Sequence, residues 1–174
     1  MQNGLIRKAT AADASLVAEL SRATFYETFA PFNTAENMQL FMDGPFHREK
    51  LMQEVEDPAN LFFLALEGEQ AVGYVKMKVN NDAPGLEGQQ AIEIARIYAI
   101  AQQVGRGVGR RLMEHCLDVA AQLNMDIIWL GVWEQNRRAI DFYTRWGFEP
   151  FGTHLFQLGN DPQTDWLMKR PVQR

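Results

Sequence analysis

Three glycines alternate with other residues between positions 105 and 109, where a run of β-forming residues meets an amphipathic segment. Gly105, Gly107 and Gly109 would let a ligand approach the backbone N–H groups, and a helix that begins there adds free donors and the positive end of its dipole. Formal positive charge comes from the arginines of the same stretch, Arg106, Arg110 and Arg111. This combination indicates an anion-binding loop. The alternative is an ordinary tight turn before a helix, which requires fewer glycines and arginines.

Two common nucleotide-binding motifs do not fit this glycine loop. A P-loop requires Lys-Ser or Lys-Thr after its last glycine, whereas Arg110 and Arg111 stand there. The dinucleotide pattern G-x-G-x-x-G would place its last glycine on Arg110 or Leu112, and it normally follows the first strand of a parallel unit. Neither a P-loop nor a dinucleotide-binding fold is therefore indicated.

The elements that position the glycine loop follow from hydrophobic periodicity. A strand is expected over 91–100, and a helix is expected from Gly107 because apolar residues recur at helical spacing as far as Leu123. A strand over 126–133 and a helix over 136–148 that ends at Gly147 follow. The loop therefore lies at the strand-to-helix junction of a β-α-β unit.

The rest of the chain supplies further strands and helices. Strands are expected at 5–10, as a hairpin within 60–79, at 149–158 and at 164–170, and helices at 10–25, 33–42 and 47–57. Thr34 or Asn33 is the expected N-cap of the second of these helices. This element order predicts an α+β fold in which helices pack on a mixed sheet.

Composition and charge restrict the classes of function. The 174 residues are 47% hydrophobic and carry a net charge of −5, which fits one domain over 1–174 and disfavours nonspecific binding to nucleic acid or anionic membranes. The single Cys116 excludes an intrachain disulfide, and no Asp, Glu or His cluster has metal-ligand spacing. Without a long apolar run or a signal-peptide core, the expected location is the cytoplasm.

The glycine loop resembles the coenzyme A loop of the GCN5-related N-acetyltransferase (GNAT) superfamily. That pattern, Gln/Arg-x-x-Gly-x-Gly/Ala, follows a strand of the form Leu-Tyr-Val, and this chain has Ile-Tyr-Ala at 97–99. Aligned from the strand, Gly107 and Gly109 take the two small positions, while Val104 departs from the Gln/Arg position. A literal Gln-x-x-Gly-x-Gly also begins at Gln102.

A second segment resembles the same superfamily. "NRRAIDFYTRWGF", at 136–148, matches the pattern N-x-x-A-x-x-F/L-Y-x-x-x-G-F at every defined position. The resemblance implies a GNAT fold, with a largely antiparallel sheet of about seven strands flanked by helices and a bulge that splays strand 4 from strand 5. Blocks such as "RATFYETF" and "QTDWLM" are similar to PaiA-type bacterial spermidine/spermine N-acetyltransferases.

The resemblance implies acetyl transfer from acetyl-CoA to an amine, without a metal. Backbone groups of Ile97 and Ala99 would bond the pantetheine amides, and an N–H near Tyr98 or Ala99 would stabilise the oxyanion. Backbone N–H groups would hold the pyrophosphate along the whole loop, which consists of Val104, Gly105, Arg106, Gly107, Val108, Gly109 and Arg110.

Two residues of the second segment match functional positions of the superfamily. Tyr143 takes the place of its frequent general acid, and an ordinary tyrosine pKa near 10 keeps the hydroxyl protonated. Asn136 matches a cofactor-contacting asparagine. The alternatives are core packing for Tyr143, which shares a helical face with other apolar residues, and a helix N-cap role for Asn136.

The general base is less clearly indicated. Glu93 precedes the Ile-Tyr-Ala strand, where some relatives carry a basic carboxylate, and it would deprotonate the substrate ammonium directly or through water. The alternative is a solvated strand charge. His154 is the other candidate base, although a lone histidine on a strand is more often structural. Acidic residues that could hold a polycation, but are more often surface charges, are Glu27, Glu36, Asp43 and Asp165.

The expected partner is a small-molecule amine, first a polyamine such as spermidine or spermine and then another small amine or a protein amine. A different class of function is a catalytically weak coenzyme A-binding module with a regulatory role. A homodimer is compatible with the resemblance, because dimers are common among relatives.

Overall fold

The computed structural model describes residues 4–80 and 82–173. Its strands form one sheet in the order β1-β2-β3-β4-β5-β7-β6, in which neighbours are antiparallel except for the parallel pair β4–β5. The strands are β1 Leu5–Lys8, β2 Asn60–Glu67, β3 Gln70–Val79, β4 Ala91–Ala99, β5 Ile127–Trp133, β6 Glu149–Leu158 and β7 Asp161–Pro171. The α-helices are α1 Ala14–Phe29, α2 Ala35–Asp43, α3 Arg48–Glu56, α4 Val108–Gln122 and α5 Arg137–Arg145.

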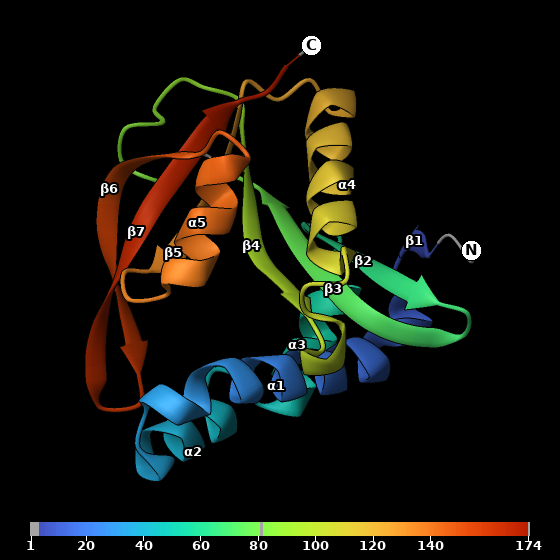
Figure 1. Cartoon of the computed structure of the whole chain (residues 1–174), viewed down its shortest axis with the longest axis vertical. Helices are drawn as coiled ribbons and strands as arrows, with labels where there is room; N and C mark the ends of the chain where they lie inside the picture. The colour runs from blue at the N-terminus through green and yellow to red at the C-terminus, as the bar shows by residue number, and fades with distance from the viewer. Residues whose placement is uncertain (1–3, 81, 174) are drawn as a thin grey trace.

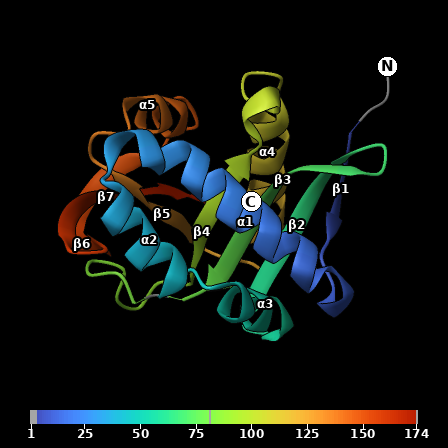
Figure 2. The ribbon, with the colours of Figure 1, turned by 90° about the horizontal axis from the view of Figure 1, so that it is seen from below.

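Helices cover both faces of the sheet. Figure 2 shows α4 and α5 above the sheet, α2 and α3 below it, and α1 running across the front. The larger core cluster lies between the sheet and the helices α4 and α5. Leu112, Met113 and Cys116 of α4 are fully buried there. Burying a large apolar side chain contributes about 1.5–3 kcal/mol, so these contacts fix α4 firmly on the sheet.

A second layer of apolar packing joins α1 to the sheet and to α2. Val17 and Leu20 of α1 pack with Phe62, Leu64 and Tyr74 of β2 and β3. Further along α1, a cluster rich in phenylalanine connects the helix to α2, the segment before α3 and β6; it includes Phe25, Phe41, Phe46 and Leu158. The far end of α1 is therefore bound to aromatic side chains that also border the site described below.

The α+β prediction is confirmed, and the differences from the expected elements are confined to their ends. Helix α1 continues to Phe29 rather than ending near Phe25, and β7 begins at Asp161 rather than at 164. Tertiary packing and hairpin pairing extend these elements beyond their local sequence signal. Thr34 rather than Asn33 caps α2, because its hydroxyl accepts a hydrogen bond from the Asn37 amide at 3.2 Å.

The sheet is divided where its strands are parallel. Strands β4 and β5 pair only from Ala91–Ile127 to Glu93–Trp129, and beyond these residues they diverge (Figure 1). The register of β3 against β4 shifts at this point, since Lys76 lies opposite Arg96 but Met77 lies opposite Ile94. Ala95 is thus the extra residue of a bulge that bends β4 away from β5, as the resemblance implied.

Candidate active site

The divergence of β4 and β5 leaves backbone groups of β4 without a strand partner. The Ile100 amide donates to the Val72 carbonyl of β3 at 2.9 Å. In an antiparallel ladder, every second residue points its N–H and C=O groups to the same neighbour. The backbone groups of Ile97 and Ala99 therefore point away from β3 and into the gap. They are available to an elongated ligand with amide groups.

The glycine loop lies at the end of this gap and leads into α4. Gly105 and Gly107 have φ values of +83° and +87°, and a Cβ atom placed on either would meet no atom within 4 Å. The first intrahelical bond runs from the Arg111 amide to the Gly107 carbonyl at 3.0 Å. The amides of Val108, Gly109 and Arg110 precede it, so they have no acceptor inside the helix.

Two amides of the predicted loop are already engaged. The Val104 amide donates to Ala101 at 3.3 Å, and the Arg106 amide donates to Gln103 at 3.1 Å. Both bonds close turns that set the loop conformation. The N–H groups that could hold a pyrophosphate are therefore those of the glycines and of the first turn of α4. Val104 contributes only the surface of its partly exposed side chain.

The arginines of the loop do not all face the gap. Arg111 pairs with Glu67 at 2.6 Å, and Arg110 pairs with Glu114 at 2.9 Å on the exposed surface of α4. Sequence reasoning missed Arg138 and Arg145, which extend from α5 to the cavity wall. Arg138 falls within the "NRRAI" segment, but neither residue occupies a defined position of the pattern.

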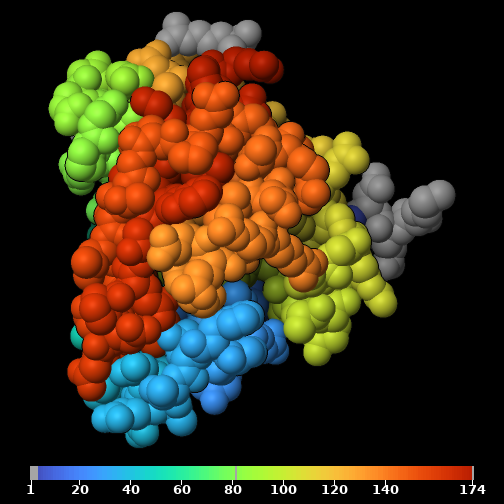
Figure 3. Space-filling view, turned by 60° about the vertical axis from the view of Figure 1, so that its left-hand side comes forward, coloured from blue at the N-terminus to red at the C-terminus, as the bar shows by residue number. Residues whose placement is uncertain are grey.

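One cavity of about 740 Å³ contains most of the predicted site residues. The space-filling view shows the hollow between α1, the start of α4 and α5 (Figure 3). One half, next to the glycine loop, is lined by Ile97, Ala99, Val104, Gly105, Gly107, Gly109, Arg110, Asn136 and Tyr143. The other half is strongly aromatic and is lined by Phe25, Phe29, Phe41, Phe46, Trp133 and Phe156. We call these the loop half and the aromatic half.

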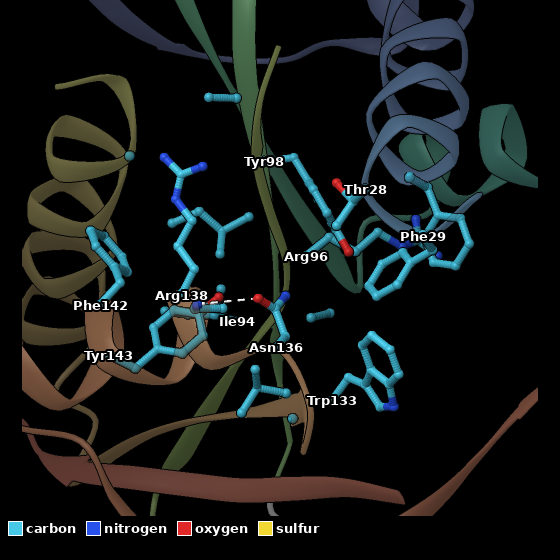
Figure 4. A pocket seen from close by; sticks show the side chains of 18 of the residues that line it. Thr28, Phe29, Ile94, Arg96, Tyr98, Trp133, Asn136, Arg138, Phe142 and Tyr143 are labelled. Atoms are coloured by element: carbon cyan, nitrogen blue, oxygen red, sulfur yellow. Dashed lines mark hydrogen bonds between the residues drawn. The ribbon is translucent and has the colours of Figure 1, made fainter. Parts of the chain in front are cut away.

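Tyr143 lies on the wall of the loop half, beside Asn136 (Figure 4). Its side chain is buried, and burial raises the pKa of the hydroxyl well above its usual value. The hydroxyl is therefore protonated at neutral pH and able to donate a proton. Asn136 fixes the start of α5, because its Oδ1 accepts a hydrogen bond from the Ala139 amide at 3.2 Å. The N-cap role is thus present, and the residue also lines the cavity.

Tyr98 separates the two halves from the β4 side. Its ring stacks on Tyr74 with centroids 6.1 Å apart, and it faces the cavity beside Thr28 of α1 (Figure 4). Burial raises the pKa of Tyr98, and the nearby Tyr74, Tyr143 and Asp165 raise it further. Tyr98 is thus within electrostatic range of both the loop half and the aromatic half.

Glu93 does not line the cavity within the part of the chain that the structure describes. It belongs to the last parallel pair of β4 and β5, before the gap begins, and its Oε2 accepts a hydrogen bond from Asn80 Nδ2 at 3.0 Å. Direct removal of a substrate proton by Glu93 would require contact that this position does not provide. A role for Glu93 through water remains a hypothesis.

The carboxylates that reach the cavity differ in their partners. Glu54 of α3 receives hydrogen bonds from Arg96 at 2.6 and 3.1 Å, and Lys76 lies 3.1 Å from it. Burial alone would raise the pKa of Glu54, but these two cations outweigh burial and lower it. Asp165 of β7 has only His154, at 3.7 Å, as an ion-pair partner in the described chain.

No cluster of His, Cys, Asp or Glu suited to a metal ion occurs within the described ranges. Cys116 is buried in the core, where burial raises the pKa of its thiol. No helix in the same ranges is long and apolar enough to cross a membrane.

The sequence profile of the Acetyltransferase (GNAT) family matches residues 21–148. This chain belongs to that family. An uncharacterised N-acetyltransferase of Lactobacillus delbrueckii subsp. lactis is 37% identical over 154 residues, which cover 88% of each chain. A PaiA N-acetyltransferase of Thermoplasma acidophilum, solved with coenzyme A, superposes with a TM-score of 0.77 over 98% of this chain and 99% of its own, at 20% identity.

A third comparison concerns the co-substrate. A putative acetyltransferase of Salmonella typhimurium, solved with acetyl-CoA, matches with a TM-score of 0.68 at 19% identity over 99% of this chain and 96% of its own. As a GNAT-family member, the chain is an N-acetyltransferase with acetyl-CoA as co-substrate. The divergent strands, the glycine backbone and the free helix amides of the loop half fit a ligand that combines amide and phosphate groups.

Proposed function

We propose that this GNAT acetyltransferase acetylates a primary amine, with polyamines such as spermidine or spermine as the first acceptors to test. The observation that carries the proposal is a cavity that joins the glycine loop to an aromatic compartment containing a carboxylate, Asp165. An activated acetyl group delivered from the loop half would meet an amine bound in the aromatic half. Acetyl-CoA supplies the activated thioester when it is bound.

The residues of the loop half have distinct tasks in this proposal. Backbone groups of Ile97 and Ala99 bond the amides of the pantetheine arm, and the N–H groups that start α4 hold the pyrophosphate. Arg138 adds positive charge beside them. The Tyr143 hydroxyl gives its proton to the departing thiolate, and a β4 N–H that points into the gap stabilises the oxyanion.

The aromatic half supports an acceptor with a cationic amine and an apolar body. Methylene chains lose contact with water against Phe29, Phe41 and Trp133, and an ammonium group is attracted to aromatic faces and to Asp165. Spermidine and spermine combine these features, and the chain's net charge of −5 favours cations. A different small amine or a protein amine is the second candidate acceptor.

The test measures free thiol released from acetyl-CoA across a panel of amines. Spermidine is compared with an amine of similar length whose tail is uncharged, each at about 0.01 M and 0.1 M ionic strength, where the Debye length falls from about 30 to 10 Å. We expect the KM for spermidine to rise with salt, while acetyl-CoA affinity responds less. Equal efficiency and equal salt response of the two amines would reject the polyamine assignment.

The same panel distinguishes a regulatory module from an enzyme. Coenzyme A binding without amine-dependent thiol release, for every amine in the panel, would favour a catalytically weak coenzyme A-binding module. Light scattering at several concentrations tests whether the chain forms a homodimer. These outcomes do not depend on which amine is preferred.

A further inference from the structure

We propose that Asp165 accepts the proton of the acceptor's ammonium group, with His154 positioned behind it as the route to solvent. This inference rests on the proposed function, because it assigns a role within amine acetylation. It places the base on β7, in the aromatic half of the cavity, rather than on β4 where sequence reasoning had placed it.

Strand register brings the two residues together. Asp165 lies opposite Trp133 of β5 on one side and opposite His154 of β6 on the other. The His154 Nε2 atom is 3.7 Å from Asp165 Oδ2, and Gly131 of β5 lies directly against the pair. A Cβ atom at Gly131 would come within 3.0 Å of the His154 ring and 3.5 Å of the Asp165 carboxylate. Glycine at this position therefore keeps space for the pair.

Asp165 is the lining carboxylate that keeps its acceptor capacity. The described residues that line the cavity include two carboxylates, Glu54 and Asp165. Glu54 already accepts two hydrogen bonds from Arg96 and contacts Lys76. Within residues 4–80 and 82–173, no hydrogen bond is made to the Asp165 carboxylate, and its side chain is only 14% exposed. A largely buried carboxylate without donors favours a cationic partner.

Burial shifts the pKa values of the two proton-binding groups towards one another. It raises the pKa of Asp165 to about 6, and the charge of His154 offsets only part of that effect. An ammonium group in the aromatic half also loses water, and burial lowers the pKa of an amine. The two pKa values approach one another, so the proton moves more readily from nitrogen to oxygen. His154 is 44% exposed and lies 3.7 Å from the carboxylate, so it connects Asp165 to the solvent-exposed surface.

Titratable groups of other strands face Asp165. His154 faces it from β6 and Tyr98 from β4, since the Asp165 charge is among the causes that raise the pKa of Tyr98. The other titratable or charged residues on the cavity wall are Glu54, Arg96, Arg110, Arg138, Tyr143 and Arg145. Glu54 and Arg96 form an ion pair, and Arg110 pairs with Glu114. His154 is the charged neighbour that acts on the pKa of Asp165, which it lowers.

The proton balance of the step is complete. An N–H bond of the ammonium breaks and an O–H bond forms on Asp165, which leaves the electron pair on nitrogen. The neutral amine attacks the thioester carbonyl, the C–S bond breaks, and the thiolate takes the Tyr143 proton. The amide nitrogen loses its second proton, which restores Tyr143, and the Asp165 proton leaves to solvent past His154.

The central experiment compares Asp165→Asn with the wild-type enzyme across pH. At pH 7 we expect kcat/KM to fall by about 10²- to 10⁴-fold, with unchanged coenzyme A affinity by calorimetry. The wild-type profile should show an acidic limb near pH 6, whereas the variant should lose that limb. Its deficit should shrink towards pH 10, near the ordinary pKa of an alkyl ammonium, because more amine is then already neutral.

Two other variants sharpen the interpretation. His154→Ala removes the charge that lowers the Asp165 pKa, so the acidic limb should move to higher pH. Glu149→Gln, on the exposed end of β6, is the matched control and should leave the profile unchanged. If Glu93→Gln rather than Asp165→Asn removes the acidic limb, Glu93 is the base and the inference is wrong.

A measurement that does not require catalysis separates this inference from the proposed function. The Asp165 carboxyl carbon is followed by NMR in the protein with coenzyme A, and its signal is assigned by its loss in Asp165→Asn. Adding butylamine should change both the chemical shift of this carboxyl carbon and the pH midpoint of its titration. An unchanged carboxyl titration overturns the inference even if the enzyme turns over, and so does a loss of activity below about threefold when chemistry limits the rate. Absent turnover with every amine would instead reject the proposed function.

Discussion

Tyr143 combines a position on the cavity wall with the protonated state that an acid role requires. The hydroxyl lies on the wall of the loop half, and burial raises its pKa above the usual value, so it is protonated at neutral pH. Tyr143→Phe should keep packing and coenzyme A affinity but lower kcat by about 10²- to 10⁴-fold. Steady-state kinetics together with calorimetry measure these two effects separately.

The matched control for this prediction is Tyr26→Phe, which removes a hydroxyl from an exposed tyrosine of α1. That variant should behave as wild type. A loss below about threefold in Tyr143→Phe, with chemistry shown to limit the rate, would return Tyr143 to a purely packing role.

Individual site residues could be predicted from the sequence where a local motif contains them. Asn136 and Tyr143 belong to one contiguous segment, so their spacing on a helix could be recognised from the sequence. Asp165 and His154 could not be paired in this way, since they come together only through the register of β6 and β7. The sequence offered His154 as a candidate base and Asp165 as one of four acidic residues that could hold a polycation, but no pattern linked the two.

At the scale of elements, the glycine loop depends on backbone conformation as much as on space. Gly107 is the N-cap of α4 with φ +87°, a region that residues with a Cβ atom rarely adopt. Gly107→Ala should raise the dissociation constant of coenzyme A by about tenfold or more, because charge-assisted bonds of about 1.5–3 kcal/mol each depend on this turn. Isothermal calorimetry measures the change.

Gly88→Ala provides the control for the loop prediction. Gly88 has φ +77° and open space around it, but it lies in the connection before β4 and not on the cavity wall. Both variants carry a similar backbone strain, so both should lose a similar amount of thermal stability. If their coenzyme A affinities are also equal, the loop does not hold the phosphates.

The ion cluster of Glu54, Arg96 and Lys76 joins α3 to β4 and β3 at the cavity wall. Arg96 also lies over the Phe46 ring at 4.8 Å. Glu54→Ala would leave two partly buried cations without their carboxylate, and removing one partner of such a pair costs about 3–5 kcal/mol. Urea unfolding measures this loss. Glu56→Ala, on the exposed face of the same helix, should change stability by less than about 0.5 kcal/mol.

Elements were predicted more accurately than their contacts. The hydrophobic period identified each helix and strand, and the strand-to-helix junction at the glycine loop was expected from its residue types. The cluster around Glu54 was not expected, because its members lie 20 to 42 positions apart and no local pattern connects them. The aromatic half was equally hidden, since its rings come from α1, α2, β5 and β6 and from the segment before α3.

For the whole molecule, stability should depend on pH through carboxylates whose pKa values are shifted in opposite directions by folding. Hydrogen bonds from Arg7 lower the pKa of Asp13, and the cation partners of Glu54 lower its pKa against the effect of burial. A lowered folded-state pKa stabilises the fold above the unfolded value of about 4, and this stability is lost as pH falls below it. Burial of Asp165 has the opposite sign and costs stability as pH rises towards 6.

Thermal unfolding between pH 3 and pH 8 checks this pattern. The melting temperature should peak at a mildly acidic pH and fall steeply below pH 4. Asp13→Asn should lower the melting temperature at pH 7 but flatten the acid-side decline, whereas Asp118→Asn, on the exposed surface of α4, should do neither. An acid limb with unchanged slope in Asp13→Asn would show that the Arg7–Asp13 pair is not responsible.

The divided sheet has a consequence for hydrogen exchange that follows from alternation along a single strand. The Ile100 amide is bonded to β3, whereas the neighbouring amides of Ile97 and Ala99 point into the gap. Without ligand, NMR-detected exchange should therefore be slow at Tyr98 and Ile100 and fast at Ile97 and Ala99. A bound pantetheine arm would slow the fast pair alone, so the odd–even contrast would fade as the site fills. The loss of this contrast would show, at each residue of β4, that a ligand occupies the gap. The measurement also works in a variant that has lost all catalysis.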